Sequence, residues 1–272
     1  MLRQLALLAV GLTFAVTASA APEAELWERW TAHDEKSTAV IDHAVWDKLL
    51  KKYIRSAALG LNRFSYGAVT AKDLWDLSGY LAALQAVKIS GYNRDEQRAY
   101  WINLYNAATI KTVLEHYPVE SIRDIDLGGG FFTSGPWSEP FLKVEGEAVS
   151  LDDIEHRILR PIWKDPLIHY SVNCASVGCP NLVRDAYTGE SAQRLAEANA
   201  SAYVNSPRGA RMEEGELYVS SIYEWFKSDF GGSDASVIAH LKRYAGPELR
   251  KQLAGVDHSS GDDYDWTLND AK

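Results

Sequence analysis

The spacing of apolar residues along the chain predicts a mainly helical protein. Leu74, Leu77, Leu81 and Leu84, for example, recur at intervals of three and four residues, which places them on one face of a helix. The same periodicity, with capping residues and helix breakers at its ends, predicts helices over residues 23–33, 42–55, 70–87, 93–116, 151–160, 190–204, 221–230 and 233–244, and one after Pro247.

Shorter stretches rich in β-branched and aromatic residues predict strands. The expected strands and hairpins cover residues 62–66, 141–149, 167–172, 211–219 and 264–269. Helices thus dominate a few strands that pair mostly as hairpins, which is an α+β arrangement. Because no repeat, low-complexity segment or linker divides the chain, we expect residues 21–272 to form a mainly helical single domain around a small, mostly antiparallel sheet.

The first twenty residues have the pattern of a secretory signal peptide. Arg3 is their only charged residue, residues 5–16 are an apolar run, and residues 18–20 have the small-x-small form of a cleavage site. The apolar run is shorter than the roughly 20 residues that a membrane span needs. Residues 1–20 therefore predict a periplasmic or secreted protein, with no stable membrane insertion after cleavage.

Charge and composition disfavour some classes of partner. The chain has 28 Lys and Arg against 37 Asp and Glu, a formal net charge of −9 at pH 7. Because this charge repels phosphate backbones and anionic membrane surfaces, nucleic-acid binding is not expected. The hydrophobic content of 46% and the nine tryptophans are sufficient for a substantial core, so we expect an ordered protein.

Both cysteines lie in one loop that is predicted to follow a strand. Residues 167–172 are apolar and β-rich, and Asn173, Cys174, Ser176 and Cys179 come directly after them. Reactive groups are commonly delivered from such loops. We therefore expect the functional site here, with a small molecule or a peptide as its substrate.

Asn103 and Asn106 are two amides in an otherwise apolar part of the predicted helix 93–116. They lie one turn apart and share a helix face. An unpaired buried amide costs about 1–3 kcal/mol, so both side chains need partners. A structural polar network and a pair of side chains directed into a cleft are both open interpretations. We expect at least one amide to turn toward the Cys174 loop.

Four ordered motifs resemble a known family. The motifs are Tyr100-Trp-Ile-Asn-Leu-Tyr-Asn-Ala107, Asp152-Asp-Ile-Glu-His-Arg-Ile-Leu-Arg160, His169-Tyr-Ser-Val-Asn-Cys-Ala-Ser-Val-Gly-Cys-Pro180 and Tyr264-Asp-Trp-Thr-Leu-Asn269. Over about residues 46–269 the chain resembles the family known as domain of unknown function 547 (DUF547), here as an exported bacterial member. The resemblance brings no settled activity. A distant similarity of the family to papain-like or transglutaminase-like thiol enzymes implies cysteine chemistry. In the usual pattern of these enzymes a long apolar helix directly follows the cysteine, and this chain departs from that pattern after Cys174.

Cys174 as a nucleophile needs a base within hydrogen-bond reach and a third group that orients this base. On an ideal strand His169 and Cys174 face opposite sides, so His156 on the preceding helix is the favoured base. Glu155 is its expected carboxylate partner, with Asp152 one turn earlier as an alternative. This arrangement predicts a thiol-dependent hydrolase or acyl transferase that acts on amide, peptide or ester bonds.

Polar side chains around this centre are candidates for substrate binding. Amides can donate to a developing oxyanion, and an arginine can hold a carboxylate. The candidates are Asn103, Asn106, Arg160, His169, Asn173 and Ser176. For Arg160, which precedes Pro161 at a helix end, interaction with the helix dipole is an alternative explanation.

A structural disulfide between Cys174 and Cys179 is the main alternative to thiol chemistry. Two thiols close in sequence can pair in an oxidising compartment, and the protein would then be a non-catalytic module that binds a ligand or a protein. The C-x4-C spacing matches neither a zinc finger nor the C-x-x-C of thioredoxin-like proteins, and no H-E-x-x-H occurs, so no metal or other cofactor is expected.

Overall fold

The structure is a computed structural model that describes residues 22–128 and 135–272. The predicted signal peptide, residues 1–20, lies outside the described residues, so export stays a prediction. Within the described ranges, no helix is both long enough and apolar enough to cross a membrane.

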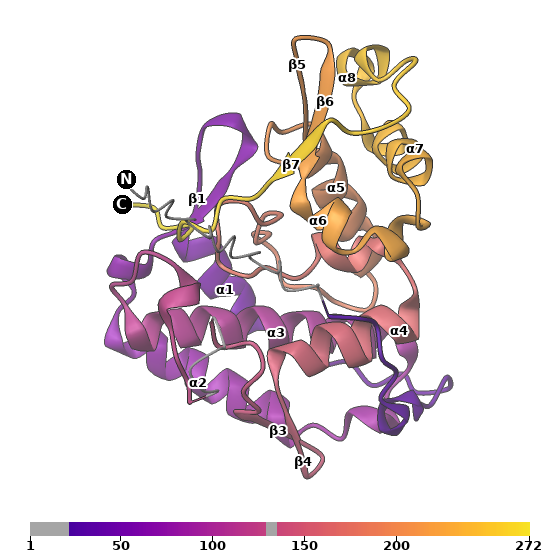
Figure 1. Cartoon of the computed structure of the whole chain (residues 1–272). Coiled ribbons are helices and arrows are strands. Elements are labelled where there is room, and N and C mark those ends of the chain that lie inside the picture. Colours follow the sequence, from indigo (N-terminus) through magenta and orange to yellow (C-terminus); the bar gives the residue numbers. More distant parts are fainter. Residues whose placement is uncertain (1–21, 129–134) are drawn as a thin grey trace, which may run out of the picture.

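Helices form most of the secondary structure, as the apolar spacing predicts (Figure 1). The α-helices are α1 (Ala44–Tyr53), α2 (Ala71–Ala86), α3 (Arg94–His116), α4 (Arg160–Trp163), α5 (Ala192–Val204), α6 (Ser221–Trp225), α7 (Asp234–Tyr244) and α8 (Pro247–Gln252). The predicted helices at 42–55, 70–87, 93–116, 190–204 and 233–244 are confirmed, with ends shifted by a few residues.

The long helix α3 is the axis of the fold. Its start is fixed by Asn93, whose side-chain oxygen accepts a hydrogen bond from the Glu96 backbone N–H at 3.0 Å. It ends at His116, ahead of Pro118, which disfavours further helix. Every residue from 96 to 110 is buried, because α3 packs against α2, α5 and the segment 153–159. Polar groups on α3 can therefore reach several elements at once.

The strands form three small sheets rather than the single sheet expected from the sequence. The strands are β1 (Ile54–Ser56), β2 (Asn62–Phe64), β3 (Leu142–Val144), β4 (Glu147–Val149), β5 (Ala210–Glu213), β6 (Glu216–Ser220) and β7 (Gly261–Asp263). β1–β2, β3–β4 and β5–β6 are antiparallel pairs, and β7 joins β6 in parallel. The class is α+β, and both predicted hairpins, at 141–149 and 211–219, are confirmed.

The predicted strand before the cysteines is wrong. Residues Pro166–Tyr170 form a 3₁₀-helix, η7. Pro166 occupies its first position, and the Asp165 side chain caps it by accepting a hydrogen bond from Leu167 N at 2.9 Å. A short apolar run is compatible with a strand or a buried helix, and these local capping contacts stabilise the helix. The strand-parity argument against His169 therefore no longer applies.

Two further sequence predictions change at the ends of the chain. The helix expected at 23–33 is reduced to a 3₁₀ turn, Glu28–Thr31. The tail 264–269 is not a regular strand, because only a single bridge, Ser176 to Leu268, pairs it with the cysteine loop. The regular strand in this region, β7, comes just before it. The tail nevertheless crosses the front of the molecule beside the cysteine loop (Figure 1).

The helix that carries His156 is largely a π-helix. Ser150 caps it, with Ser150 Oγ accepting from Asp153 N at 3.0 Å, and residues Asp153–Leu159 (η6) have π-helical geometry. It continues as α4 through Pro161, beyond the end predicted at residue 160. The wider turn changes which side chains share a face, and π-helical segments are frequent at functional sites.

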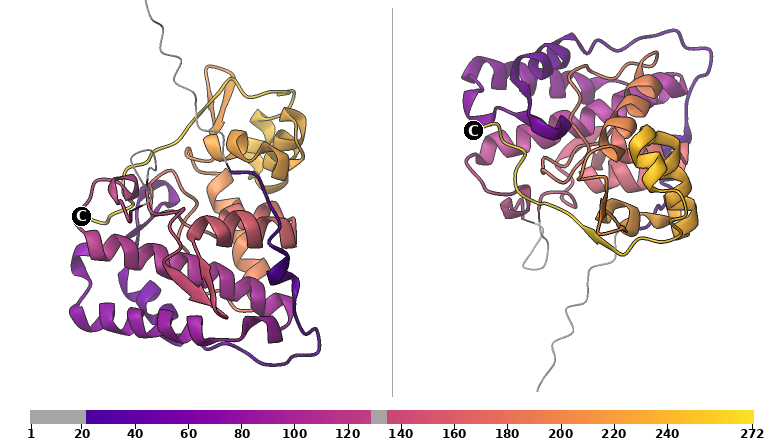
Figure 2. Two further views of the ribbon diagram at one scale, coloured as in Figure 1. Left: turned by 60° about the horizontal axis from the view of Figure 1, so that its bottom comes forward. Right: turned by 90° about the horizontal axis from the view of Figure 1, so that it is seen from above.

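Two hydrophobic clusters meet at the cysteine loop. One cluster surrounds α1, α2 and α3, and the other contains residues of α5, α6 and α7. In the left view of Figure 2, the helices in orange and yellow lie mainly to one side of the helices in purple and magenta. Leu167 and Tyr170 belong to the second cluster, whereas Ile168 and Val172 belong to the first. The segment leading to Cys174 is thus held between two cores.

Candidate functional site

The cysteine loop is fixed to α3 by Asn106. This buried side chain donates from Nδ2 to Ser171 O at 2.9 Å and accepts at Oδ1 from Asn173 N at 2.8 Å. The expectation that at least one α3 amide turns toward the loop is confirmed. Because the Asn106 amide bonds to backbone groups on both sides of Val172, it positions the loop.

Asn103 serves a different segment. Its Nδ2 donates to Tyr187 O at 2.7 Å, and its Oδ1 accepts from Tyr187 N at 3.1 Å. The amide is fully buried and its contacts lie outside residues 171–180. Asn103 therefore belongs to a structural polar network, one of the two interpretations that the sequence left open.

Asn173 holds the turn that contains both cysteines. Its Nδ2 donates to Pro180 O at 2.7 Å, and its Oδ1 accepts from Ala175 N at 3.0 Å. Ala175 has a φ of 59°, the left-handed region that non-glycine residues rarely occupy. Asn269 N, from the tail, donates to Ala175 O at 2.9 Å. These bonds hold a conformation that an alanine adopts only under constraint, directly after Cys174.

The Cys174 sulfur is surrounded by hydrogen-bonding groups. It lies 3.1 Å from Cys179 Sγ, 3.0 Å from Tyr264 Oη and 3.3 Å from Ser176 Oγ. The hydrogen bonds from Cys179, Ser176 and Tyr264 outweigh burial and the repulsion by Glu155, and they lower the pKa of Cys174. Burial and the neighbouring Cys174 raise the pKa of Cys179 well above its ordinary value. Cys174 is therefore the better thiolate of the pair.

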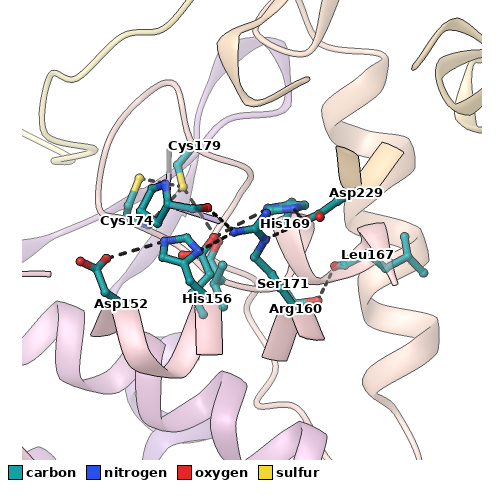
Figure 3. Close-up of polar contacts among 12 residues, drawn as sticks. Asp152, His156, Arg160, Leu167, His169, Ser171, Cys174, Cys179 and Asp229 are labelled. Atoms are coloured by element: carbon teal, nitrogen blue, oxygen red, sulfur yellow. Dashed lines mark hydrogen bonds and ion pairs between the residues drawn. The ribbon is translucent and has the colours of Figure 1, made fainter. Parts of the chain in front are cut away.

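The two cysteines are free thiols, not a disulfide. Their sulfurs are 3.1 Å apart, whereas a disulfide bond is about 2.05 Å long. Cys174 is partly exposed and Cys179 is buried, and Figure 3 shows their side chains next to each other. The structural disulfide expected under the alternative interpretation is absent between these two described residues.

His169 lies between two carboxylates. Its Nε2 is 2.7 Å from Asp229 Oδ2 (Figure 3), and its Nδ1 is 3.7 Å from Glu155 Oε1. Burial opposes the imidazolium, but these two acids outweigh burial and raise the pKa of His169. Burial also opposes the Glu155 carboxylate, yet the charges of His156, His169 and Arg160 lower the pKa of Glu155 to about 2. Glu155 thus contacts His169 rather than His156.

Arg160 completes a buried charge network with these residues. Its Nε donates to Asp229 Oδ2 at 2.6 Å, and its Nη1 donates to Pro22 O at 2.7 Å. The guanidinium also stacks over Phe226, with 4.6 Å from Cζ to the ring centroid. These contacts explain the position of Arg160 better than the helix dipole does, and they leave it poorly placed to hold a substrate carboxylate. We define the charge network as Glu155, Arg160, His169 and Asp229.

His156 is oriented by Arg160. Its Nδ1 accepts from Arg160 Nη1 at 3.0 Å, and its Nε2 faces Asp152 Oδ1 at 3.7 Å (Figure 3). Because arginine only donates, this contact places the imidazole proton on Nε2 and occupies the lone pair of Nδ1. Burial lowers the pKa of His156 to about 4, so the ring is neutral at pH 7. Among the described residues no histidine is hydrogen-bonded to Cys174, and the base role of His156 stays a prediction.

Three other groups near the thiols are not singled out by sequence reasoning as a nucleophile, base or ligand. Tyr264 was visible only as part of a motif, and Asp229 has no sequence signal beyond its place between Phe226 and Phe230. Tyr105 is the third group, and it is buried on α3. Burial, with the charges of Glu155 and Cys174, raises its pKa well above the ordinary value, so it stays a neutral donor.

Asp152 has the titration behaviour of a general acid or base. Burial, followed by the charges of Glu155 and Asp153, raises the pKa of Asp152 to about 7. A carboxyl group that titrates near neutral pH can both accept and return a proton during a reaction. Asp152 therefore takes the place beside His156 that the sequence assigned first to Glu155.

A hollow of about 430 Å³ lies away from the thiols. It is lined by Arg55, Ala57, Arg63, Val119, Glu120, Thr267, Leu268, Asp270, Ala271 and Lys272. None of the thiol-site side chains is in this lining. No group of three or more His, Cys, Asp or Glu side chains within the described ranges is arranged to hold a metal ion.

Comparison with known proteins gives a match to one family model, over part of the chain. The model of a family described as "Protein of unknown function, DUF547" matches residues 89–204. The matched region includes α3, the helix that carries Glu155 and Arg160, the cysteine loop and α5. No curated protein and no solved structure matches the chain.

Proposed function

Residues 89–204 match the DUF547 family model, and from the thiol site in this region we propose that the protein is a thiol-dependent hydrolase or acyl transferase acting on amide, peptide or ester bonds. The observation that carries the proposal is the Cys174 sulfur, which is partly exposed and has three hydrogen-bonding neighbours. These neighbours lower the pKa of Cys174 and so raise the fraction of thiolate, the nucleophilic form.

The proposed reaction proceeds through a thioester. The Cys174 thiolate attacks the substrate carbonyl carbon, a carbon–sulfur bond forms, and the amine or alcohol leaves with a proton. Water, or a second amine or alcohol, then displaces the sulfur and releases the acyl group. The neutral Tyr105 hydroxyl is the donor that we assign to the developing oxyanion, because the amides of Asn103 and Asn106 are already bonded to backbone.

We assign the proton transfers to His156 with Asp152 as its partner. His156 accepts a proton only after Arg160 releases the Nδ1 lone pair, so substrate binding must shift this contact. Asp152 needs no such movement, because its raised pKa already suits it to proton transfer. Glu155 acts one step further away, by holding His169 and Arg160 in place.

Residues 1–20 support a periplasmic or extracellular location for this activity. An oxidising compartment favours disulfides, so the Cys174 and Cys179 thiols would have to survive there in the reduced state. Small molecules and peptides are the substrates that we propose. The other candidate, a non-catalytic module that binds a ligand or protein, becomes the better description if the thiols are not reactive.

Alkylation tests the proposal directly. Protein purified without reductant is treated with iodoacetamide at pH 7, and the labelled cysteine is identified by mass spectrometry. We expect selective alkylation of Cys174 and a parallel loss of hydrolysis of small ester and amide substrates. Labelling that occurs only after denaturation and reduction, together with no hydrolysis by the untreated protein, would reject the enzyme in favour of the binding module.

A further inference from the structure

Four aromatic side chains gather beside Cys174 from three separate parts of the chain. Trp225 and Trp266 lie 5.9 Å apart between ring centroids, Tyr264 lies 4.9 Å from Trp225 and 4.7 Å from Trp266, and Trp137 lies 5.7 Å from Trp266. We call Trp137, Trp225, Tyr264 and Trp266 the aromatic surface. Trp225 is in α6, Trp137 precedes β3, and the other two are in the tail.

The tryptophans of this surface are not core residues. Trp225 is 38% exposed, and Trp137 and Trp266 are partly exposed, whereas Trp30, Trp46 and Trp101 are fully buried in the main cluster. Grouped exposed tryptophans are unusual on a soluble surface without a binding role. Trp75, which is 74% exposed on α2, is an isolated example and has no aromatic contact among the described residues.

The aromatic surface is continuous with the thiol. The ring of Tyr264 contacts both Trp225 and Trp266, while its hydroxyl lies 3.0 Å from Cys174 Sγ. Backbone bonds hold this arrangement, because Gly178 N donates to Asp265 O at 2.8 Å. A group bound on the indoles therefore lies next to the bond that the sulfur would attack.

We propose that the aromatic surface binds an aromatic ring of the substrate, adjacent to the scissile carbonyl. This inference rests on the proposed function, since it names the substrate class of the same site. The planes of Trp225 and Trp266 are tilted by 25°, whereas Tyr264 is tilted by 50° from Trp225 and by 54° from Trp266, and Trp137 is tilted by 66° from Trp266. Such angles present indole faces and edges together, which suits edge-to-face contact with another aromatic ring.

The same geometry disfavours one other ligand. A cationic ligand needs a negative aromatic face, but the Arg123 guanidinium already lies over Trp266, with Cζ at 5.2 Å from the ring centroid. The aromatic ring is the occupant that agrees with both the tilt of the rings and the local positive charge.

Binding is measured on the Cys174→Ser variant of the full chain, which cannot form the thioester. The probes are N-acetyl-phenylalanine amide and N-acetyl-alanine amide, which differ only in the ring, and binding is followed by calorimetry. We expect the ring-bearing probe to bind at least about tenfold tighter, from burial of the ring and its aromatic contacts. The difference should disappear when Trp225→Ala is added and persist when Trp75→Ala is added.

A second measurement locates the bound ring. With the unsubstituted protein, the phenylalanine probe should slow iodoacetamide alkylation of Cys174, and the alanine probe should do so much less. Trp266→Ala, in a different segment from Trp225, should remove this protection if Trp225→Ala proves unstable. Equal binding of the two probes, or discrimination that survives both tryptophan substitutions, would overturn the inference.

These outcomes are separable from those of the proposed function. Ring-selective binding by a protein without any hydrolysis would uphold the aromatic surface and reject the enzyme. Hydrolysis without ring selectivity would uphold the enzyme and reject the surface.

Discussion

The cysteine loop and the charge network are neighbours, but they are stabilised in different ways. In the loop, neutral side chains such as Asn106 and Asn173 bond to backbone groups, and the Cys174 sulfur remains partly exposed. In the charge network, buried ions bond mainly to one another, as Arg160 does to Asp229 at 2.6 Å. The loop thus presents a reactive atom, whereas the network uses most of its hydrogen-bonding capacity internally. The comparison indicates that the loop provides the reactive group and that the network stabilises the structure around it.

The strongest test of this division is substitution of each cysteine. Cys174→Ser should reduce activity at least about 1000-fold at a near-native melting temperature, because it removes the proposed nucleophile and little packing. Cys179→Ser is the matched control, and it should retain a measurable fraction of activity because the buried Cys179 thiol supports Cys174 by hydrogen bonds and is not the proposed nucleophile. Equal losses of stability in both variants, with no difference in activity, would contradict the assignment.

The next largest effect is expected in the charge network. Asp229→Asn removes the carboxylate shared by Arg160 and His169, and leaving buried cations without it should lower the free energy of unfolding by about 3–5 kcal/mol. Asp263→Asn is the control, because Asp263 pairs with Arg211 at the surface and should cost at most about 1 kcal/mol. Urea denaturation of both variants measures the difference.

Similar costs for the two aspartate substitutions would mean that the network is not a structural unit. A loss of activity in Asp229→Asn at unchanged stability would show that the network takes part in the reaction and does not only stabilise the structure. Either result would break the division between the two regions.

Sequence patterns predict the elements whose signals are local. α3 follows from its apolar spacing and from caps within a few residues of its ends, and the turn near Gly215 lies between strands that pair in register. The strand prediction for residues 167–172 was wrong because their conformation depends on the cap from Asp165 and on packing against two different cores. The division of the strands into three sheets is equally non-local.

The candidate site was predictable in its location but not in its pairings. The two cysteines and the amide of Asn106 were recognisable because polar or reactive residues are unusual in apolar surroundings. The pairing of Glu155 with His169 depends on the π-helical turn and on η7. The spacing of apolar residues predicts neither of these two elements. Tyr264 reaches Cys174 from 90 positions away, which only the tertiary fold reveals.

A smaller effect is expected from the hydroxyl beside the sulfur. Tyr264→Phe keeps the ring on the aromatic surface and removes one hydrogen bond to Cys174, so the thiol pKa should rise. Alkylation by iodoacetamide at pH 7 should slow about tenfold, since a hydrogen bond to a charged group contributes on the order of 1.5 kcal/mol. Tyr218→Phe on β6 is the control and should leave the rate unchanged. An unchanged rate in Tyr264→Phe would show that the hydroxyl does not stabilise the thiolate.

The smallest expected effect concerns Asp152, which lies between the two regions. Its pKa is raised to about 7 in the folded protein, so its contribution to stability is fully present below the unfolded pKa and is lost as the pH rises through about 7. Asp152→Asn is neutral at every pH, so relative to the unsubstituted protein it should gain stability between pH 5 and pH 8. We expect a gain of about 1 kcal/mol, because the side chain is 36% exposed and water screens part of the effect. Urea denaturation at the two pH values measures it, and a difference that does not change with pH would show that Asp152 ionises normally and is not tuned for proton transfer.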